Sequence, residues 1–124
     1  MLFKKFLKKG ETMSIDTREE NNHIIVYLKG RIDVHLATEI ESELMKLIEQ
    51  NPNKDFILNL SDVEYMSSSG LRVFVSIMRY LKERNRNLKL SNLSLAVKRV
   101  FEVVELMDMF DIYNDESDAL ASNR

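Results

Sequence analysis

The sequence contains no cysteine, and it has only three glycines and one proline in 124 residues. Without cysteine the chain has no disulfide framework, no thiolate nucleophile and no cysteine-type zinc site. Gly10, Gly30 and Gly70 form neither of the glycine-rich loops that bind the phosphates of nucleotides. The missing cysteine fits a reducing compartment, and we expect a cytoplasmic protein because no export signal is recognisable.

The charge of the chain is nearly balanced. A net charge of -2 offers no basic surface for nucleic acid, so we expect no nucleic-acid partner. Hydrophobic residues make up 44% of the chain and charged residues 31%, which is ordinary for a globular protein. The length allows one compact domain, which we expect to be a monomer or a weak dimer.

The first thirteen residues combine lysines with large apolar side chains. In a helix, four apolar side chains would face away from four lysines, as in a membrane-surface anchor. So short a helix is marginal alone, and we favour a disordered extension, or an upstream start codon before Met13. We therefore predict a basic extension at 1–13, one domain at 14–121, a frayed tail at 122–124, and no membrane contact.

Strand-like and helix-like patterns alternate along the rest of the chain. Strands are predicted at residues 14–18, 23–28, 55–60, 88–91 and 110–113. Helices are predicted after Asp33, after the serines at 67–69, after Ser94, and at 116–121. Because strands joined by helices run parallel, we predict an α/β domain. Its sheet should be mixed and mostly parallel, with about four to five strands and about four helices packed mainly on one side.

Two glycines mark expected turning points. The apolar run 24–28 predicts a strand buried on both faces, which Gly30 should end. After Gly70 the helix has two apolar stripes, of which we expect the first to lie in the core: Leu71, Phe74, Val75, Met78 and Leu81. The flanking stripe is left open between core and interface: Val73, Ile77 and Tyr80.

The serines before Gly70 stand where a predicted strand gives way to a predicted helix. Ser67 or Ser68 can serve as the N-cap, because a serine hydroxyl satisfies an amide that a new helix leaves unpaired. A plain helix cap is the simplest interpretation. A phosphoryl group at this position would meet free amides and the positive end of the helix dipole, so a modification site is the alternative.

Other chemistry has little support in the sequence. His23 and His35 have no metal-ligand spacing, and we expect both on the surface, with no metal and no cofactor. The serines lack the leading glycine of a hydrolase elbow, and no histidine follows to act as a base. We therefore expect a protein that is not an enzyme.

Three motifs in the same order resemble the STAS domain of the anti-sigma factor antagonists. They are Leu28-Lys29-Gly30-Arg31-Ile32-Asp33, then Asn59 to Leu71 with the Ser-Ser-Gly-Leu elbow, and Leu95 to Phe101. The resemblance covers roughly residues 14–120. It departs from the best-known members at Ser67, where they carry Asp, and at Arg72, where they often carry a small residue.

The resemblance implies that Ser68 accepts a phosphoryl group, with Ser67 and Ser69 as competing acceptors. It also implies a partner surface around the elbow, for which the candidates are Asp33, Met66, Ser67, Ser69, Gly70, Leu71 and Arg72. Arg72 could pair with a phosphoserine, or it could be merely solvated.

Two functions are compatible with this resemblance. In the first, the unmodified domain binds an anti-sigma factor that has a serine-kinase ATPase domain and thereby releases a sigma factor. Phosphorylation of Ser68 ends this binding, and a serine phosphatase restores it. This would be partner switching in bacterial transcription regulation. In the alternative, the chain is a STAS accessory module of a transporter or membrane ATPase complex, or a small-ligand module, and the serines are caps only.

Overall fold

The computed structural model describes residues 3–7 and 14–122. Within them the elements are β1 (Phe3–Leu7), β2 (Ser14–Glu20), β3 (His23–Ile32), α1 (Val34–Gln50), β4 (Asp55–Met66), α2 (Ser68–Lys82), β5 (Leu88–Ser91), α3 (Leu95–Val103), the 3-10 turn η1 (Met107–Met109), β6 (Asp111–Tyr113) and α4 (Glu116–Ala121). This order confirms the predicted α/β domain. No helix among the described residues is long and apolar enough to cross a membrane.

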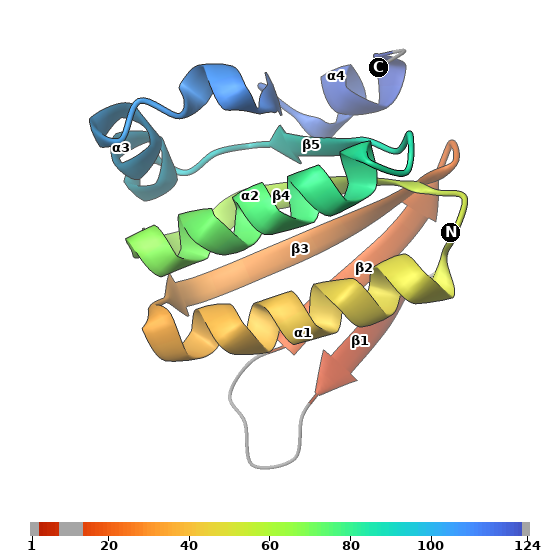
Figure 1. The fold of residues 1–124 in the computed structure, drawn as a ribbon, viewed down its shortest axis with the longest axis horizontal. Coiled ribbons are helices and arrows are strands. Elements are labelled where there is room, and N and C mark those ends of the chain that lie inside the picture. The colour runs from red at the N-terminus through yellow and green to blue at the C-terminus, as the bar shows by residue number, and fades with distance from the viewer. Residues whose placement is uncertain (1–2, 8–13, 123–124) are drawn as a thin grey trace.

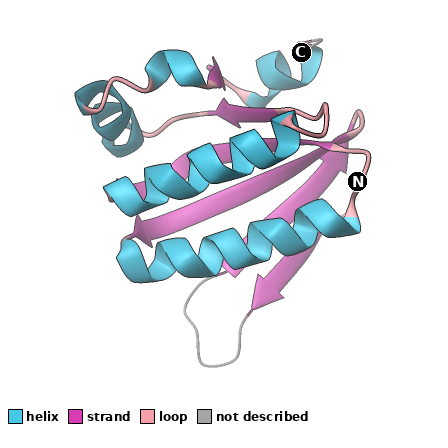
Figure 2. Cartoon of the chain, in the orientation of Figure 1, coloured by secondary structure: helices cyan, strands magenta, loops and turns pink. Residues whose placement is uncertain are grey.

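The strands form one sheet in the order β1-β2-β3-β4-β5-β6 (Figure 1). The pairs β1–β2 and β2–β3 are antiparallel, whereas β3–β4, β4–β5 and β5–β6 are parallel. Figure 2 shows α1 and α2 side by side over one face of this sheet. The parallel strands are joined through helices, so the carboxyl ends of β3, β4 and β5 open at the same edge.

Strand β1 departs from the expected extension at the N-terminus. Residues 3–7 are paired with β2, so these five residues belong to the sheet rather than lying outside it. The outer edge of β2 carries backbone groups that an extended segment can pair with, which favours a strand there over a short helix. Residues 1–2, 8–13 and 123–124, for which disorder or fraying is predicted, lie outside the described residues.

The two central strands are longer than predicted. Gly30 does not end β3, which continues to Ile32, and β4 likewise continues to Met66. Gly30 has φ +88°, and the β3–β4 register shifts between Gly30 and Arg31. A residue without Cβ adopts this conformation readily, so the glycine permits an irregularity inside the strand instead of a turn. The longer strands carry the chain to the edge where α1 and α2 begin.

Both faces of the sheet are covered, but unequally. Ile24, Val26 and Leu28 of β3 point into the main core beneath α1 and α2, whereas Ile25 packs with Ile57 and with Ala119 of α4 on the opposite face. The helices therefore lie mainly on one side, and the run 24–28 is buried on both faces, as predicted. The opposite face has only a small apolar centre.

Helix α2 buries most of the predicted stripe together with part of the flanking stripe. Leu71, Phe74 and Leu81 are buried, as expected, and so are Val73 and Ile77 of the flanking stripe. Val75 and Met78, in contrast, are only half-buried. Helix α1 packs along one side of α2 and places the flanking stripe in the core (Figure 1). The side of α2 turned away from α1 keeps partly exposed apolar residues.

Candidate functional site

The serine elbow lies beside the Asp33 elbow at the carboxyl ends of β3 and β4. Strand residues Ile32 and Met66 are paired in register, and the amide of Ser67 donates a hydrogen bond to the carbonyl oxygen of Ile32 at 2.9 Å. This bond joins the last residue of β3 to the residue that begins the second elbow. The two elbows are thus neighbours, as the sequence predicts.

Asp33 is the N-cap of α1. Its Oδ1 accepts a hydrogen bond from the amide of Leu36 at 2.9 Å, and its backbone carbonyl accepts one from Ala37 at 2.9 Å. The residue is exposed. The carboxylate therefore satisfies a first-turn amide of α1 while it remains in contact with solvent, and a partner can reach it.

The three serines differ in accessibility. Ser68, the first residue of α2, is exposed, whereas Ser67 and Ser69 are half-buried. Ser67 is the N-cap by position, but its hydroxyl makes no capping bond, and its Oγ is buried without a hydrogen-bond partner in the described part of the chain. A kinase could reach the Ser68 hydroxyl without moving the chain, but it could not reach the Ser67 hydroxyl in this way.

The first turn of α2 offers favourable surroundings for an anion. The amides of Gly70 and Leu71 donate to the carbonyl of Ser67 at 3.0 and 3.4 Å, and no side chain caps this helix. The first amides of a helix point outward along its axis and carry partial positive charge. A phosphoryl group on Ser68 would therefore lie at the electropositive end of α2.

Gly70 allows α2 to begin close to the sheet. A Cβ at this position would lie 3.0 Å from Cγ2 of Ile32 and 3.0 Å from Cγ of Met66. With any other residue, either the side chains of Ile32 and Met66 or the first turn of α2 would have to shift by a few tenths of an ångström. Gly70 thus fixes the height at which Ser68 stands above the sheet.

Exposed apolar residues flank Ser68 on both sides. Helices α1, α2 and α3 begin at Val34, Ser68 and Leu95. Val34 is 67% exposed and Leu95 is 63% exposed. The hydroxyl of Ser94 donates to the carbonyl of Val63 at 2.7 Å, which holds the start of α3 against β4. Ser68 therefore lies in a row between two exposed apolar side chains.

Sequence reasoning missed Val34 and Leu95. Their signal was present, because each is an apolar residue directly after an N-cap that falls outside the periodic apolar face of its helix. Tyr65, 40% exposed near the end of β4, adds a third apolar group at this edge, and the guanidinium of Arg31 lies 4.5 Å from its ring centroid. These residues extend the edge into a surface on which a protein could dock.

The remaining predicted partner-binding residues take two kinds of position. Met66 and Leu71 are buried, at 2% and 3% exposure, so they support the elbow from beneath. Arg72 is exposed one turn after Ser68, and Asp62 and Glu64 are exposed on β4 just before the elbow. The edge of the sheet that carries Ser68 therefore has charged side chains of both signs.

His23 lies far from this edge, at the start of β3, whereas His35 lies at the edge, in the first turn of α1. His35 is exposed, as predicted, but His23 is buried, at 7% exposure, and its Nε2 lies 3.1 Å from Nζ of Lys89. The prediction of a surface position for His23 was wrong, because α4 closes over the second face of the sheet. Among the described residues no group of three or more His, Cys, Asp or Glu side chains is placed to hold a metal ion.

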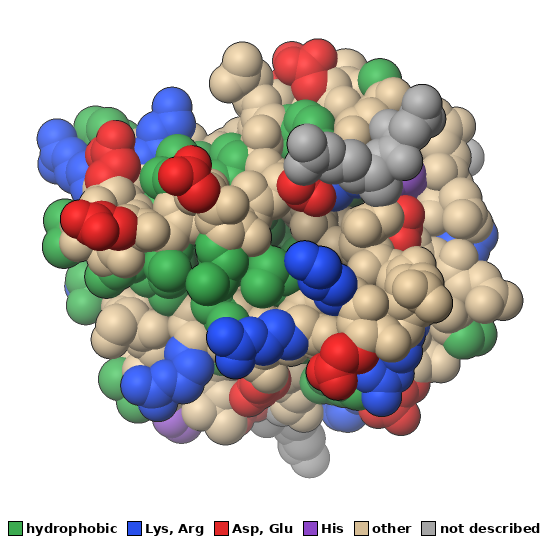
Figure 3. Space-filling view, turned by 45° about the horizontal axis from the view of Figure 1, so that its top comes forward, with side chains coloured by type: hydrophobic (Ala, Val, Ile, Leu, Met, Phe, Trp, Pro, Cys, Tyr) green, Lys and Arg blue, Asp and Glu red, His purple; other side chains and the backbone are tan. Residues whose placement is uncertain are grey.

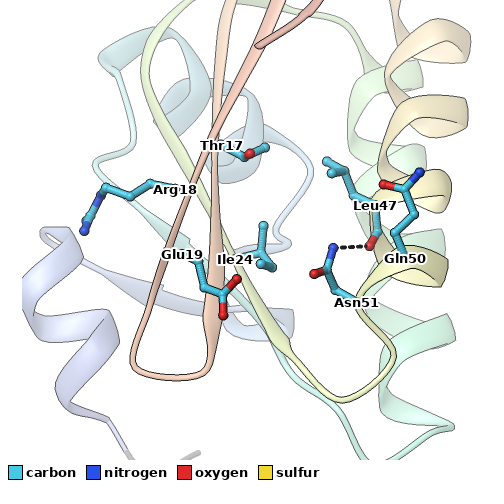
Figure 4. A pocket seen from close by; sticks show the side chains of 7 residues that line it. All are labelled: Thr17, Arg18, Glu19, Ile24, Leu47, Gln50 and Asn51. Atoms are coloured by element: carbon cyan, nitrogen blue, oxygen red, sulfur yellow. Dashed lines mark hydrogen bonds between the residues drawn. The ribbon is translucent and has the colours of Figure 1, made fainter. Parts of the chain in front are cut away.

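A cavity of about 210 Å³ lies at the opposite end of α1, between its last turn and strand β2 (Figure 4). Its walls include Thr17 and Ile24 on the sheet and Leu47 and Asn51 on the helix side. Figure 4 shows the amide of Asn51 bonded to the Leu47 carbonyl, so this polar group is already satisfied by the helix end. Because α1 begins beside the serine elbow, the cavity is separate from that site.

Comparison with known proteins identifies the family. The STAS domain family model matches residues 14–119, and the chain belongs to this family. The anti-sigma-B factor antagonist of Bacillus subtilis is 38% identical over 81% of this chain and 90% of its own length. The protein of that name from Listeria monocytogenes is 31% identical over 90% of this chain and 97% of its own length.

Solved structures share the same fold. The anti-sigma factor antagonist SpoIIAA in its unphosphorylated form superposes with a TM-score of 0.70 at 23% identity, over 86% of this chain and 92% of that one. An anti-sigma factor antagonist from Mycobacterium paratuberculosis gives a TM-score of 0.77 at 20% identity, over 88% and 92% of the two chains.

Proposed function

We propose that this chain is an anti-sigma factor antagonist controlled by phosphorylation of Ser68. The unmodified domain binds an anti-sigma factor that has a serine-kinase ATPase domain, and a sigma factor is released. The observation that carries the proposal is that Ser68 is exposed at the start of α2, where no side chain caps the helix, and that α1 and α3 start with the exposed residues Val34 and Leu95. The names of the relatives from Bacillus and Listeria support this choice of partner.

The chain acts by binding rather than by catalysis, in the cytoplasm. The kinase partner supplies the phosphoryl group, and a separate serine phosphatase removes it. Ser68 is favoured over Ser67 because the Ser67 Oγ is enclosed, and over Ser69 because Ser69 is half-buried. The partner contacts Ser68 together with Asp33 and Arg72 at the same edge.

Phosphorylation opposes binding through charge repulsion and loss of hydration, because both cost more free energy in the complex than in the free chain. The phosphate brings about 1.5 to 2 negative charges into an edge that already carries Asp33, Asp62 and Glu64. In the complex this charge must also lose water. The helix dipole favours the phosphate by about 0.3 to 1 kcal/mol, but it does so before binding as well and cannot rescue the complex.

The size of the effect is sufficient for a switch. Changing a complex from almost fully formed to almost absent requires about 5.5 kcal/mol. One buried phosphate without a partner cation costs several kcal/mol, because burying an unpaired charge is among the largest penalties in proteins. Ser68→Asp carries less charge and fewer acceptor oxygens, so it should weaken binding only partly.

The test has two stages. First, incubation of the purified chain with the kinase partner and ATP should add one phosphate, which mass spectrometry should no longer find in Ser68→Ala. Ser67→Ala and Ser69→Ala are the matched controls and should still be phosphorylated. Phosphate that persists in Ser68→Ala but is absent from either control would transfer the site to that serine.

Second, titration calorimetry against the partner should give the tightest binding for the unmodified chain, an intermediate affinity for Ser68→Asp and the weakest for the phosphoprotein. Val34→Asp and Leu95→Asp should also weaken binding. Equal affinities for the phosphoprotein and the unmodified chain would contradict the switch and would favour pairing of the phosphate with Arg72.

A further inference from the structure

A hydrophobic patch lies along the side of α2 that faces away from α1 (Figure 3). Four of its residues are half-buried and pack on the main core, and two are exposed. We call the six the α2–α3 patch: Val75, Met78, Val100 and Met107, which pack on the core, with Val104 and Met109, which are exposed. They come from α2, from α3 and from η1. Val104 is 41% exposed and Met109 is 43% exposed, so the patch presents apolar surface to solvent.

The patch is recessed at one end. A hollow of about 90 Å³ lies between Met78 and Lys82 of α2 and Met109 of η1, and its other walls are polar as well as apolar: Arg86, Asn87, Leu88 and Asp111. Two flat or convex surfaces would leave such a hollow empty, and two copies of a recessed surface would not fill each other. A convex ridge with both apolar and polar side chains would fill it, and an amphipathic helix presents such a ridge along the border of its apolar face.

The border of the patch on α2 is positively charged. Arg72, Arg79 and Lys82 are exposed on this helix, and none of them forms an ion pair with another described residue. Figure 3 shows basic side chains along one border of the green patch and acidic side chains along the other. On the side of α3 and η1 the exposed acidic residues are Glu102, Glu105 and Asp108. The two borders of the patch thus carry charges of opposite sign.

We propose that the α2–α3 patch binds an amphipathic helix of a protein partner, with carboxylates along the flank that meets α2. Arg72 to Lys82 spans ten residues, so the basic border is about 15 Å long at 1.5 Å per residue and matches roughly three turns of a helix. This surface shares Arg72 with the edge that carries Ser68, but its apolar residues come from later turns of α2, from the end of α3 and from η1, and the inference does not rest on the proposed function.

The probe is a synthetic helical peptide of about fourteen residues. Leucines at positions i, i+3, i+4, i+7 and i+11 form its apolar face, with glutamates along one flank. The comparison peptide has lysine at each glutamate position. Titration of the full chain should shift the methyl NMR signals of Val75, Val100 and Met107. The glutamate peptide should bind about tenfold more tightly, because three pairs at the rim each contribute a small free energy that adds up. Added salt should reduce this difference.

Variants of exposed residues keep the test independent of folding. Arg79→Glu should weaken binding of the glutamate peptide and improve binding of the lysine peptide, and Met109→Asp, at a residue that is 43% exposed, should abolish binding of both. Val34→Asp is the matched control at the Ser68 edge and should leave the affinity unchanged. Equal affinities for the two peptides, or no binding at millimolar peptide, would overturn the proposal. So would NMR shifts confined to Val34 and Leu95, or NMR shifts that depend on protein concentration alone.

Discussion

Nζ of Lys89 lies 3.1 Å from Nε2 of His23, inside the second face of the sheet. The same Nζ donates to the carbonyl oxygens of Ala119 and Ser122 at 2.8 and 3.1 Å. Nδ1 of His23 lies 2.7 Å from the carbonyl oxygen of Asn21, so a proton on Nδ1 leaves Nε2 to accept from Lys89. Lys89, with no exposed surface, thereby ties the end of α4 to the start of β3.

Lys89 should make stability rise with pH in the alkaline range. Burial lowers the pKa of Lys89 from its ordinary value of 10.5, although the carboxylates of Asp55 and Asp111 oppose this. Between the lowered pKa and 10.5 the unfolded chain binds more protons than the folded chain, so the free energy of unfolding increases with pH. Lys89→Met should lack this increase, as measured by urea unfolding from pH 7 to 9.5.

Lys82→Met is the control for Lys89, because Lys82 is exposed on α2. It should retain the alkaline increase in stability. The same dependence on pH in Lys89→Met as in the unmodified chain would refute a role for the buried ammonium group. The measurements stop below pH 10 because burial also raises the pKa of Tyr27. Above that pH, ionisation of Tyr27 in the unfolded chain would make the free energy of unfolding fall as pH rises.

Glu116 should make the domain sensitive to acid. Its Oε1 accepts from Arg18 at 2.7 Å and its Oε2 from Asn59 at 2.6 Å. Burial raises the pKa of this carboxyl, but hydrogen bonds from Asn59, Tyr27 and Arg18 outweigh burial and hold the pKa below 4.5. The stability from Glu116 is therefore present above pH 4.5 and is lost as pH falls through the lowered pKa.

In Glu116→Gln this part of the acid dependence should be missing, and the variant should also be less stable at pH 7 by about 1 to 3 kcal/mol, because charged hydrogen bonds to Arg18 are removed. Thermal unfolding between pH 3 and pH 7 measures both effects. Asp118→Asn, on the exposed side of the same helix, should leave the acid dependence almost unchanged. Parallel pH curves for the unmodified chain and Glu116→Gln would contradict this assignment.

Gly70→Ala should lower stability although it lies in a helix. Alanine favours a helix over glycine by about 1 kcal/mol. The new methyl group would, however, meet Ile32 and Met66 at 3.0 Å, and such overpacking costs about 1 to 3 kcal/mol. We expect a net loss of about 1 kcal/mol in urea unfolding, with a displaced first turn of α2 in the amide NMR spectrum.

Ser76→Ala is the comparison for Gly70→Ala, since Ser76 is exposed in the middle of α2. It should be neutral or slightly stabilising, because alanine has the higher helix propensity. If Gly70→Ala were more stable than the unmodified chain, the contact with Ile32 and Met66 would not limit the approach of α2.

Arg86 should contribute more to stability than its place in a charged loop suggests. Helix α1 has no basic residue in its last turn, and Arg86 supplies one from the loop after α2. Its NH2 donates to the carbonyls of Asn51 at 2.6 Å and Ile48 at 3.4 Å, and its Nε donates to Lys54 at 3.0 Å. Arg86→Ala should cost about 1 to 3 kcal/mol in urea unfolding, because it leaves partly buried carbonyls unpaired.

Arg84→Ala is the matched control, because Arg84 is exposed two residues away and donates only to the carbonyl of Tyr80. It should change stability by less than about 0.5 kcal/mol. Arg86→Lys should recover only part of the loss, since a single ammonium group cannot reach all three carbonyls. Equal effects of Arg84→Ala and Arg86→Ala would show that the end of α1 does not depend on the guanidinium.

The sequence by itself determined the order of elements and the local signals that start the helices. Asp33 and Ser94 cap α1 and α3 as predicted, and the boundaries of α4 agree, because capping and apolar periodicity are local properties. It also determined that Asp33 and the serines meet, because parallel strands joined by helices place their carboxyl ends at one edge.

Only the tertiary structure decided which side chains are buried and which are free. Ser67, Ser68 and Ser69 are alike in sequence, yet packing encloses the Ser67 Oγ and leaves Ser68 exposed. The buried stripe of α2 was set by the neighbouring α1, and the burial of His23 by α4, a helix more than ninety residues away in the chain. Burial depends on what covers a residue from elsewhere in the fold, and a local pattern carries no information about such neighbours.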